Sequence, residues 1–549
     1  MKTIRQQSLL MLLLCIIIAP AHAQKKSGKA VAAPAPPAYG NVESITAAQL
    51  KDYLEFIASD ELEGRDTPSR GLDTAARFIA THLSRWGLKP AGDNGTYFQH
   101  FALRRNRVDP AQTWAEINGQ RFSFGDDFLT QFTAGSASAP LIYVGNGWMI
   151  KGKNLNPYDK LDVKDKIVVA VTSLPKGVTF NDLKGKQGED WDNPVHYAQT
   201  HGAKAVIAVP QFQTLIGWSQ SRQFVTERGT VLVEKYIRPD NNAIPIITVS
   251  PRMLNALFQG EKQNATTIFN RATTGESVEG FDFNPNKKVS LNVVIKSEPA
   301  QTQNIVAMLE GTDPTLKNEY IAIGAHYDHV GIGTPVNGDA IYNGADDDGS
   351  GTVAVMALAE AYAKGPRPKR SIIFVWHAGE EHGLWGSAFI TDQPPVPISQ
   401  IITQLNIDMI GRARQEGDTK PANQALPAPG EVFVIGSKMM STDLGELSER
   451  VNNSLLKLKF NYKYDDPKDP ERFFYRSDHF NYARKGVPII FYMDGSHEDY
   501  HRPSDSVEKI DFAQMEKVTR TVYATAWELG NAAARPRVDK PLPAEVIGN

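Results

Sequence analysis

Polar side chains follow four apolar runs in the C-terminal half of the chain. The runs and their polar residues are 321–325 with His326, 371–376 with Glu380 and Glu381, 401–407 with Asp408, and 487–493 with His501. In open α/β sheets, ligands bind outside the carboxyl ends of the strands. We therefore expect these side chains to meet at one edge of a sheet, where they would form a single site.

A fifth polar element opens a helical pattern over residues 351–363. It consists of three consecutive aspartates, residues 346–348, followed by Gly349. Asp and Gly are favoured at helix starts, so a plain helix cap is the alternative interpretation. Three adjacent carboxylates carry more negative charge than a cap needs. The cluster therefore favours a bound cation.

The types of these side chains indicate which cation they would hold. The set contains histidines and carboxylates but no thiol, because the only cysteine, Cys15, lies near the N-terminus outside this half of the chain. Such a set suits zinc, cobalt or manganese. Cysteine-ligated metal, disulfide bonds and thiol catalysis are excluded if the segment around Cys15 is removed.

The pair Glu380-Glu381 suggests how the metal would be used. Adjacent residues point in different directions, so one carboxylate can bind metal while the other faces a metal-activated water and takes its proton. A solvated pair on a surface turn is the alternative for an isolated Glu-Glu. The preceding buried run and the flanking glycines favour the catalytic interpretation.

The N-terminus has the pattern of a secretory signal peptide. Lys2 and Arg5 supply a positive region, residues 9–18 form an apolar run too short to span a bilayer comfortably, and residues 21–23 fit a cleavage site before Gln24. An uncleaved anchor is the alternative. We expect export through the secretory pathway to a periplasm or to the outside of the cell.

The overall composition is that of a globular protein without a strong charge bias. The chain has 549 residues, with 59 basic and 62 acidic side chains and a formal net charge of −3. Neither nucleic acid nor an anionic membrane surface is an expected partner. A peptide is the expected substrate, and the sequence leaves the oligomeric state open.

Six segments together resemble the two-zinc exopeptidase family that includes bacterial leucyl aminopeptidase and glutamate carboxypeptidase. They occur in the order of that family and are residues 324–328, 347–351, 380–387, 406–409, 477–479 and 500–505. The resemblance implies a zinc-exopeptidase fold of the phosphorylase/hydrolase-like type. This is an α/β architecture with a mixed, mostly parallel sheet flanked by helices. The alternation of strand and helix patterns after residue 285, which begins with a predicted strand over 289–295, also indicates it.

The resemblance also implies a role for each site residue. His326 and Asp408 would bind one metal ion, Glu381 and His501 the other, and Asp347 would bridge the two, which are most simply Zn²⁺ ions. Glu380 would be the general base. The residues Asp328, Asp348, Asp478 and His479 would contact ligands or substrate, with Asp328 orienting His326.

Two further expectations follow from the resemblance. The peptide bond between Asp347 and Asp348 should be cis. The histidines His329, His377 and His382 are expected to form hydrogen bonds within their loops, whereas His479 is expected to face the substrate.

The β-like runs between residues 106 and 284 resemble a protease-associated domain inserted into the peptidase domain. The predicted divisions are a signal peptide (1–23), a disordered leader (24–40), a peptidase domain in two pieces (41–105 and 285–535), the inserted domain (106–284) and a tail (536–549). Such a domain is expected to shape access of substrate to the active site.

These observations predict a secreted exopeptidase with two metal ions, and an aminopeptidase in particular. A carboxypeptidase on the same scaffold is one alternative, and it would need a cation such as Arg412 or Arg476 for the substrate carboxylate. A receptor without metal and a single-metal cyclising transferase are the others. The complete ligand set and the Glu380-Glu381 pair favour hydrolysis over both.

Overall fold

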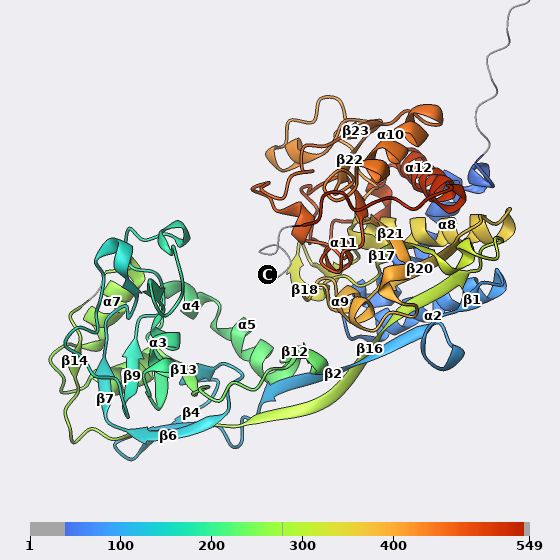
Figure 1. The fold of residues 1–549 in the computed structure, drawn as a ribbon. Coiled ribbons are helices and arrows are strands. Elements are labelled where there is room, and N and C mark those ends of the chain that lie inside the picture. The colour runs from blue at the N-terminus through green and yellow to red at the C-terminus, as the bar shows by residue number, and fades with distance from the viewer. Residues whose placement is uncertain (1–38, 277, 543–549) are drawn as a thin grey trace, which may run out of the picture. The chain divides into compact units, whose positions relative to one another are not determined.

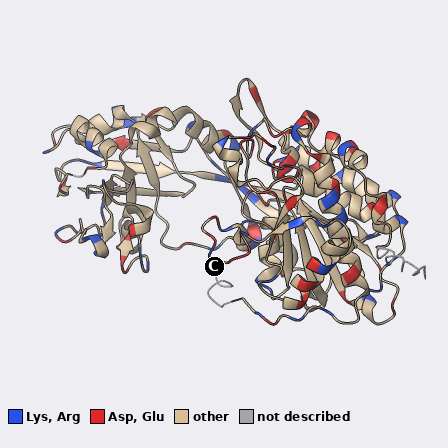
Figure 2. Ribbon diagram, turned by 90° about the horizontal axis from the view of Figure 1, so that it is seen from above, with Lys and Arg blue, Asp and Glu red and all other residues tan. Residues whose placement is uncertain are grey.

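The structure is a computed structural model that describes residues 39–276 and 278–542. The predicted signal peptide, residues 24–38 of the predicted leader and the last seven residues of the predicted tail lie outside the described residues. Within the described ranges, no helix is both long enough and apolar enough to cross a membrane. Basic and acidic residues are interspersed along the ribbon (Figure 2).

The largest sheet has ten strands, most of which come from the C-terminal half of the chain (Figure 1). Its strands are β1 (Lys89–Pro90), β2 (Phe98–Val108), β12 (Thr230–Val233), β16 (Ile295–Leu309), β17 (Tyr320–His326), β20 (Ser371–His377), β21 (Ile401–Ile407), β22 (Glu431–Ile435), β23 (Lys459–Asn461) and β24 (Ile489–Met493). Their order is β12-β2-β16-β20-β17-β21-β24-β22-β23, with β1 beside β16. The four central strands β20, β17, β21 and β24 are parallel, and antiparallel strands flank them. The predicted fold class is confirmed.

The central strands are rich in apolar residues, although β21 also contains Thr403, Gln404 and Asn406. Every residue of β20 and β21 is buried, which is typical of parallel strands covered by helices on both faces. Successive side chains point to opposite faces of a strand. Ile321 and Ile323 accordingly join one hydrophobic core, whereas Ala322 between them joins the core of the other face.

Helices cover both faces of this sheet (Figure 1). They are α1 (Ala47–Ile57), α2 (Arg70–Arg85), α8 (Gly351–Lys364), α9 (Trp385–Asp392), α10 (Thr442–Ser454), α11 (His479–Ala483) and α12 (Phe512–Asn531). Helices α1, α2, α8, α10 and α12 supply most of one core, and α11 packs in the other. The predicted first helix begins where the hydroxyl of Thr46 accepts a hydrogen bond from the Gln49 nitrogen, a favourable N-cap.

Most strands between residues 114 and 293 form separate sheets. A four-stranded sheet contains β3 (Trp114–Ile117), β4 (Gln120–Ser123), β6 (Gly135–Ala139) and β15 (Val289–Val293), and a six-stranded sheet contains β5 (Phe128–Thr130), β7 (Leu141–Tyr143), β9 (Ile167–Ala170), β11 (Ala205–Ala208), β13 (Ile246–Val249) and β14 (Phe281–Asp282). The pair β8 (Met149–Ile150) and β10 (Trp191–Asp192) is separate. The helices are α3 (Pro194–Thr200), α4 (Phe212–Ile216), α5 (Trp218–Gln223), α6 (Pro251–Phe258) and α7 (Ala265–Thr274). These sheets have hydrophobic cores of their own.

Two strands lie in a different sheet from the one that the sequence pattern suggests. The strand predicted over 289–295 does not join the peptidase sheet, because β15 pairs with β3 and β6 instead. The strand that enters the large sheet is the following one, β16, which pairs with β2 over eleven residue pairs. Conversely, β12 lies within the segment 106–284 but pairs with β2 at the edge of the large sheet.

Candidate metal centre

The predicted metal-binding residues lie where the sequence placed them relative to the strands. His326 is the last residue of β17, Asp408 directly follows β21, and Glu381 comes four residues after the end of β20. Asp347 lies in the turn before α8, and His501 lies in the loop after β24. The carboxyl ends of parallel strands therefore bring together residues that are up to 175 positions apart in the chain.

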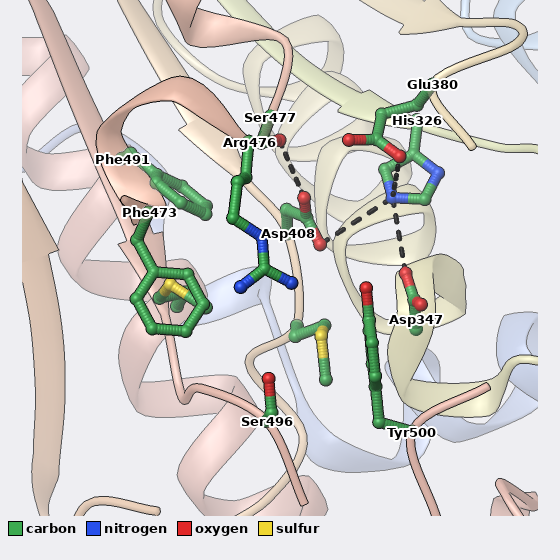
Figure 3. A pocket seen from close by; sticks show the side chains of 12 residues that line it. His326, Asp347, Glu380, Asp408, Phe473, Arg476, Ser477, Phe491, Ser496 and Tyr500 are labelled. Carbon is green, nitrogen blue, oxygen red and sulfur yellow. Dashed lines mark hydrogen bonds and ion pairs between the residues drawn. The ribbon is translucent and has the colours of Figure 1, made fainter. Parts of the chain in front are cut away.

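The side chains of these residues converge in two groups. The first ligand group is His326, Asp347 and Asp408, and the second ligand group is His329, Asp347, Glu381 and His501. In the first group, Nε2 of His326 lies 3.3 Å from Oδ1 of Asp347 and 3.6 Å from Oδ1 of Asp408 (Figure 3). In the second group, Nε2 of His501 lies 3.0 Å from both Oδ2 of Asp347 and Oε2 of Glu381. Asp347 thus offers one oxygen to each group, as a bridging ligand must.

The two groups fit divalent metal ions. Ligand atoms about 2.0 to 2.2 Å from a tetrahedral zinc ion lie roughly 3.3 Å from one another, close to the separations in both groups. Oδ2 of Asp347 and Nε2 of His501 are buried and form no hydrogen bond, although they are only 3.0 Å apart. Buried polar atoms without a partner are rare in proteins, so a cation between them accounts for their positions.

Buried carboxylates hold the turn that carries Asp347. Asp505 accepts hydrogen bonds from the main-chain nitrogens of Asp346 and Asp347 at 3.0 and 3.1 Å, and burial raises the pKa of Asp505 to about 6. Asp348 accepts from the main-chain nitrogen of Met409 at 3.1 Å. Asp348 therefore ties the turn to the loop after β21. The peptide bond between Asp347 and Asp348 is cis, as predicted.

Ser477 fixes the orientation of Asp408. Its hydroxyl donates a hydrogen bond to Oδ2 of Asp408 at 2.6 Å and accepts one from the Asn406 amide at 2.9 Å. The other oxygen, Oδ1, is left to face His326. The sequence motif over 477–479 marked this segment, but the role of the serine follows only from the structure.

Asp328 contacts the His326 ring through the carbonyl oxygen of its main chain. Nδ1 of His326 lies 3.1 Å from the carbonyl oxygen of Asp328 and 3.7 Å from its carboxylate, so the carbonyl is the hydrogen-bond acceptor. The carboxylate of Asp328 instead accepts a hydrogen bond from the main-chain nitrogen of Glu380 at 3.2 Å. The expectation that the Asp328 carboxylate orients His326 is therefore corrected, and that carboxylate positions Glu380.

Glu380 lies beside the first ligand group without belonging to either group. Its Oε2 is 3.9 Å from Nε2 of His326, and its side chain faces the pocket (Figure 3). Burial raises the pKa of Glu380 well above its usual range; His326 opposes this shift, and the carboxylates of Glu381 and Asp408 add to it. A carboxyl group with a raised pKa can hold and release a proton, as a general base requires.

His329 belongs to the site, which the sequence analysis did not foresee. Its Nδ1 lies 2.8 Å from Oε1 of Glu381 and 3.6 Å from Oδ2 of Asp347. His501 faces the opposite oxygen of Glu381, Oε2. His329 is thus placed to fix the second oxygen of Glu381. In the sequence, this role was indicated by the position of His329 directly after the segment 324–328.

Asp478 and His479 are buried and belong to neither ligand group. Oδ2 of Asp478 is 3.1 Å from Nδ1 of His377; burial alone would raise the pKa of Asp478, but His377 lowers it below the usual range. His479 is fully buried, lies 2.8 Å from the carbonyl oxygen of Phe474 and stacks on Phe491. Burial lowers the pKa of His479 to about 3. The expectation that His479 faces the substrate is corrected, because its ring packs among apolar side chains.

A pocket lies next to the first ligand group (Figure 3). Its apolar walls are Met409, Phe473, Phe491 and Met493. Tyr500 and Arg476 also line it, and the Tyr500 ring stacks on that of His501. Burial raises the pKa of Tyr500 well above its usual range, with the nearby carboxylates of Asp347 and Glu381 adding to the effect. The phenol therefore remains a hydrogen-bond donor.

A fully buried arginine, Arg65, holds the loops that carry the ligands. Its guanidinium donates to the main-chain carbonyls of Tyr327 at 2.9 Å, Asn343 at 2.7 Å and Gly344 at 3.0 Å, and also to that of Ile57. Burial lowers the pKa of Arg65 to about 10, against the opposing effect of carboxylates in the site. The arginine therefore joins the N-terminal region to the segments that precede His329 and Asp347.

We expect Arg65→Met to lower the free energy of unfolding by at least about 3 kcal/mol, because several buried carbonyl groups would lose their donor. Urea unfolding of the metal-free protein measures this change. Arg77→Met, which removes an exposed arginine of α2, is the matched control and should change stability by less than about 0.5 kcal/mol. Equal effects of the two substitutions would contradict the role of Arg65.

The fold and the paired ligand groups define a candidate two-metal hydrolytic centre. Residues 304–526 match the family model of peptidase family M28, and this segment contains both ligand groups and Glu380. A leucine aminopeptidase 2 from Arthroderma otae is 25% identical over 308 residues, which cover 51% of this chain and 56% of that protein. A probable zinc metalloprotease from Pyrenophora tritici-repentis is 28% identical over 282 residues, covering 46% and 56%. The chain thus spans little more than half the length of these curated relatives.

A solved structure extends the likeness beyond the matched segment. The aminopeptidase from Aneurinibacillus sp. strain AM-1 covers 91% of this chain and 96% of its own, with a TM-score of 0.51 and 17% sequence identity. At this identity the likeness concerns the fold. It agrees with the mixed sheet and flanking helices described above.

Proposed function

We propose that this protein is a metallo-exopeptidase with two zinc ions, and specifically an aminopeptidase that removes N-terminal residues from peptides. The observation that carries the proposal is the sharing of Asp347 by two convergent ligand groups, with Glu380 free beside them. The match to peptidase family M28 and the names of the similar proteins, a leucine aminopeptidase and a zinc metalloprotease, support it.

The residues of the chain divide the chemistry between them. His326, Asp347 and Asp408 would hold one ion, and Asp347, Glu381 and His501 the other. When bound, two such ions supply Lewis-acid polarisation of a carbonyl and lower the pKa of a water molecule. Glu380 would accept the proton of the attacking water at its carboxylate and then donate that proton to the leaving amine. Its burial, which raises its pKa, favours the protonated form that the second step needs.

Tyr500 supplies a second protein group to the reaction. Its hydroxyl points into the pocket from the side of Asp347 and stays protonated because its pKa is raised (Figure 3). A fixed donor at this place can stabilise the negative charge that develops on the carbonyl oxygen. Its position is maintained by stacking on the ring of His501, at 4.0 Å between centroids.

The direction of cleavage rests on the charges in the pocket. Glu380, which belongs to neither ligand group, gives the end of the pocket near the ligands a negative charge, which suits a substrate ammonium group. A carboxypeptidase would need a free cation for the substrate carboxylate. Arg412 forms an ion pair with Asp499 at 3.1 Å, whereas Arg476 lines the pocket and has no ion pair among the described residues. The charge of Glu380 and the names of the similar proteins favour an aminopeptidase, and a substrate with a blocked N-terminus tests that choice.

Export and the role of the inserted segment remain part of the proposal. The signal-peptide pattern of residues 1–23 supports secretion. The resemblance of residues 106–284 to a protease-associated domain supports a role in substrate access. If the segment has this role, its deletion should change the ratio of kcat/KM for long peptides to kcat/KM for short peptides.

A comparison of free and blocked substrates tests the proposed function. The protein should hydrolyse a leucine p-nitroanilide with a free α-amine and should not hydrolyse its N-acetyl derivative. A chelator should abolish the activity, and zinc should restore it. Hydrolysis of the acetylated substrate at an equal rate would contradict an aminopeptidase.

A further inference from the structure

Arg476 is an exposed residue that lines the pocket containing Glu380 and Asp408, so its positive charge borders that pocket. Its side chain extends into the pocket between Phe473 and Asp408 (Figure 3). The Cζ atom lies 4.8 Å from the centre of the Phe473 ring, so the guanidinium is held against the apolar wall. The charge also acts on Tyr500, where it opposes the rise in pKa.

The guanidinium has no acidic partner of its own. Within residues 39–276 and 278–542, no carboxylate forms an ion pair with Arg476, whereas Arg412 is paired with Asp499 and Arg370 with Glu319. The nearby carboxylates of the ligand groups would be neutralised by the metal ions that they bind. The charge of Arg476 is therefore left for a group of the substrate. A guanidinium suits a carboxylate, which it can contact with two parallel hydrogen bonds.

We propose that Arg476 binds a carboxylate of the substrate, and that this carboxylate is the side chain of an N-terminal glutamate or aspartate. This inference rests on the proposed aminopeptidase function and adds a substrate class to it. The α-amine of such a residue would face the carboxylate of Glu380, which belongs to neither ligand group. The methylene groups of the substrate residue would contact Phe473 and Phe491, and its carboxylate would meet the guanidinium.

Glu380 and Arg476 line the same pocket, together with Phe473. A group held by the guanidinium therefore lies in the pocket that contains the proposed general base, which places it on a residue next to the scissile bond. The same chemistry could come from the α-carboxylate of a very short peptide, so the experiment must separate the two sources.

Arg476→Met tests the inference through substrate preference. We expect kcat/KM for glutamyl and aspartyl p-nitroanilides to fall about 10- to 100-fold, because a charged hydrogen-bonding partner is lost. The value for the leucyl substrate should change less than about 3-fold, since uncharged contacts remain. Arg472→Met is the matched control: Arg472 lies four residues away over Tyr475 and does not line the pocket. It should leave all three values unchanged.

Two further arms identify the source of the carboxylate. Cleavage of Leu-Leu and of Leu-Leu-amide compares a free with a blocked C-terminus, and Arg476→Met should affect both equally. Calorimetry with free L-glutamate and L-leucine on the zinc-loaded Glu380→Gln variant gives a readout without turnover. Addition of Arg476→Met should weaken glutamate binding about 10- to 100-fold and leave leucine binding within about 3-fold.

The outcomes distinguish this inference from the proposed function. An equal loss for leucyl and glutamyl substrates, or no loss for either, would overturn the role of Arg476 while leaving the aminopeptidase intact. A loss confined to Leu-Leu would assign the guanidinium to the α-carboxylate and overturn the acidic side-chain preference. If no aminoacyl substrate were cleaved, the proposed function would fail, and glutamate binding would still decide the role of Arg476.

Discussion

Glu380→Gln should retain the metal content of the wild-type protein and lose about 10²- to 10⁴-fold in kcat, the range expected for loss of a general acid–base group. Glutamine has nearly the same shape as glutamate but cannot accept the proton of the attacking water. Glu380 belongs to neither ligand group, so the metal ions should stay bound. Its main-chain nitrogen would keep its hydrogen bond to Asp328, which leaves the loop in place.

The measurement combines metal analysis of the purified variant with kcat on a leucyl substrate. Glu416→Gln provides a matched control, because Glu416 is exposed and lies outside the pocket. It should match the wild type in both readouts. Loss of metal together with activity would show that Glu380 is a ligand, and an undiminished kcat would rule out Glu380 as the base.

Asp347→Asn should remove metal from both positions. Asp347 is the only residue shared by the two ligand groups of the described chain, and each of its oxygens faces a different histidine. An amide offers one oxygen and no negative charge, so it cannot bridge two cations as a carboxylate does. We expect activity below detection and weaker zinc binding at both positions, with the fold preserved because the side-chain volume barely changes.

Thermal unfolding reports this effect independently of activity. A ligand that binds only the folded state raises the free energy of unfolding by RT ln(1 + [L]/Kd), and it therefore raises the unfolding temperature. Zinc should therefore raise the Tm of the wild type more than that of Asp347→Asn. Asp339→Asn, an exposed aspartate of the hairpin β18 (Gly331–Val336) and β19 (Asp339–Tyr342), is the control and should respond like the wild type. An equal rise in all three proteins would contradict the bridging role.

The central strands and the position of the site could be predicted because a single physical signal marks both. Buried parallel strands are continuous apolar runs, and their carboxyl ends are where polar groups gather in such sheets. His326 stands out for this reason, since it ends a run of small and apolar residues, whereas the strand before Asp408 also contains Thr403, Gln404 and Asn406.

Strand pairing could not be predicted to the same extent. The period of a strand tells which face it buries but does not identify its partner. The segment 289–293 is a strand, as predicted, yet it pairs in the smaller sheet. The long strand β16 begins with polar residues and contains Pro299, so its first half has no apolar signal. Only the structure shows that this half is a strand, because residues 295–305 of β16 pair with the whole of β2.

Contacts between distant residues were equally hidden in the sequence. Arg412 and Arg476 were equivalent candidates there, and only the ion pair between Arg412 and Asp499 separates them. His329 and His479 were likewise two histidines beside site motifs. One lies against Glu381 and the other among apolar side chains, because their environments depend on elements more than fifty residues away or on local packing.

The most direct test of the two-metal aminopeptidase is a time course of one unblocked peptide followed by mass spectrometry. The account predicts stepwise loss of residues from the N-terminus, no loss in the presence of a chelator, and recovery on addition of zinc. The same peptide with an acetylated N-terminus should remain intact. Stepwise loss from the C-terminus, or loss that a chelator leaves unchanged, would contradict the account.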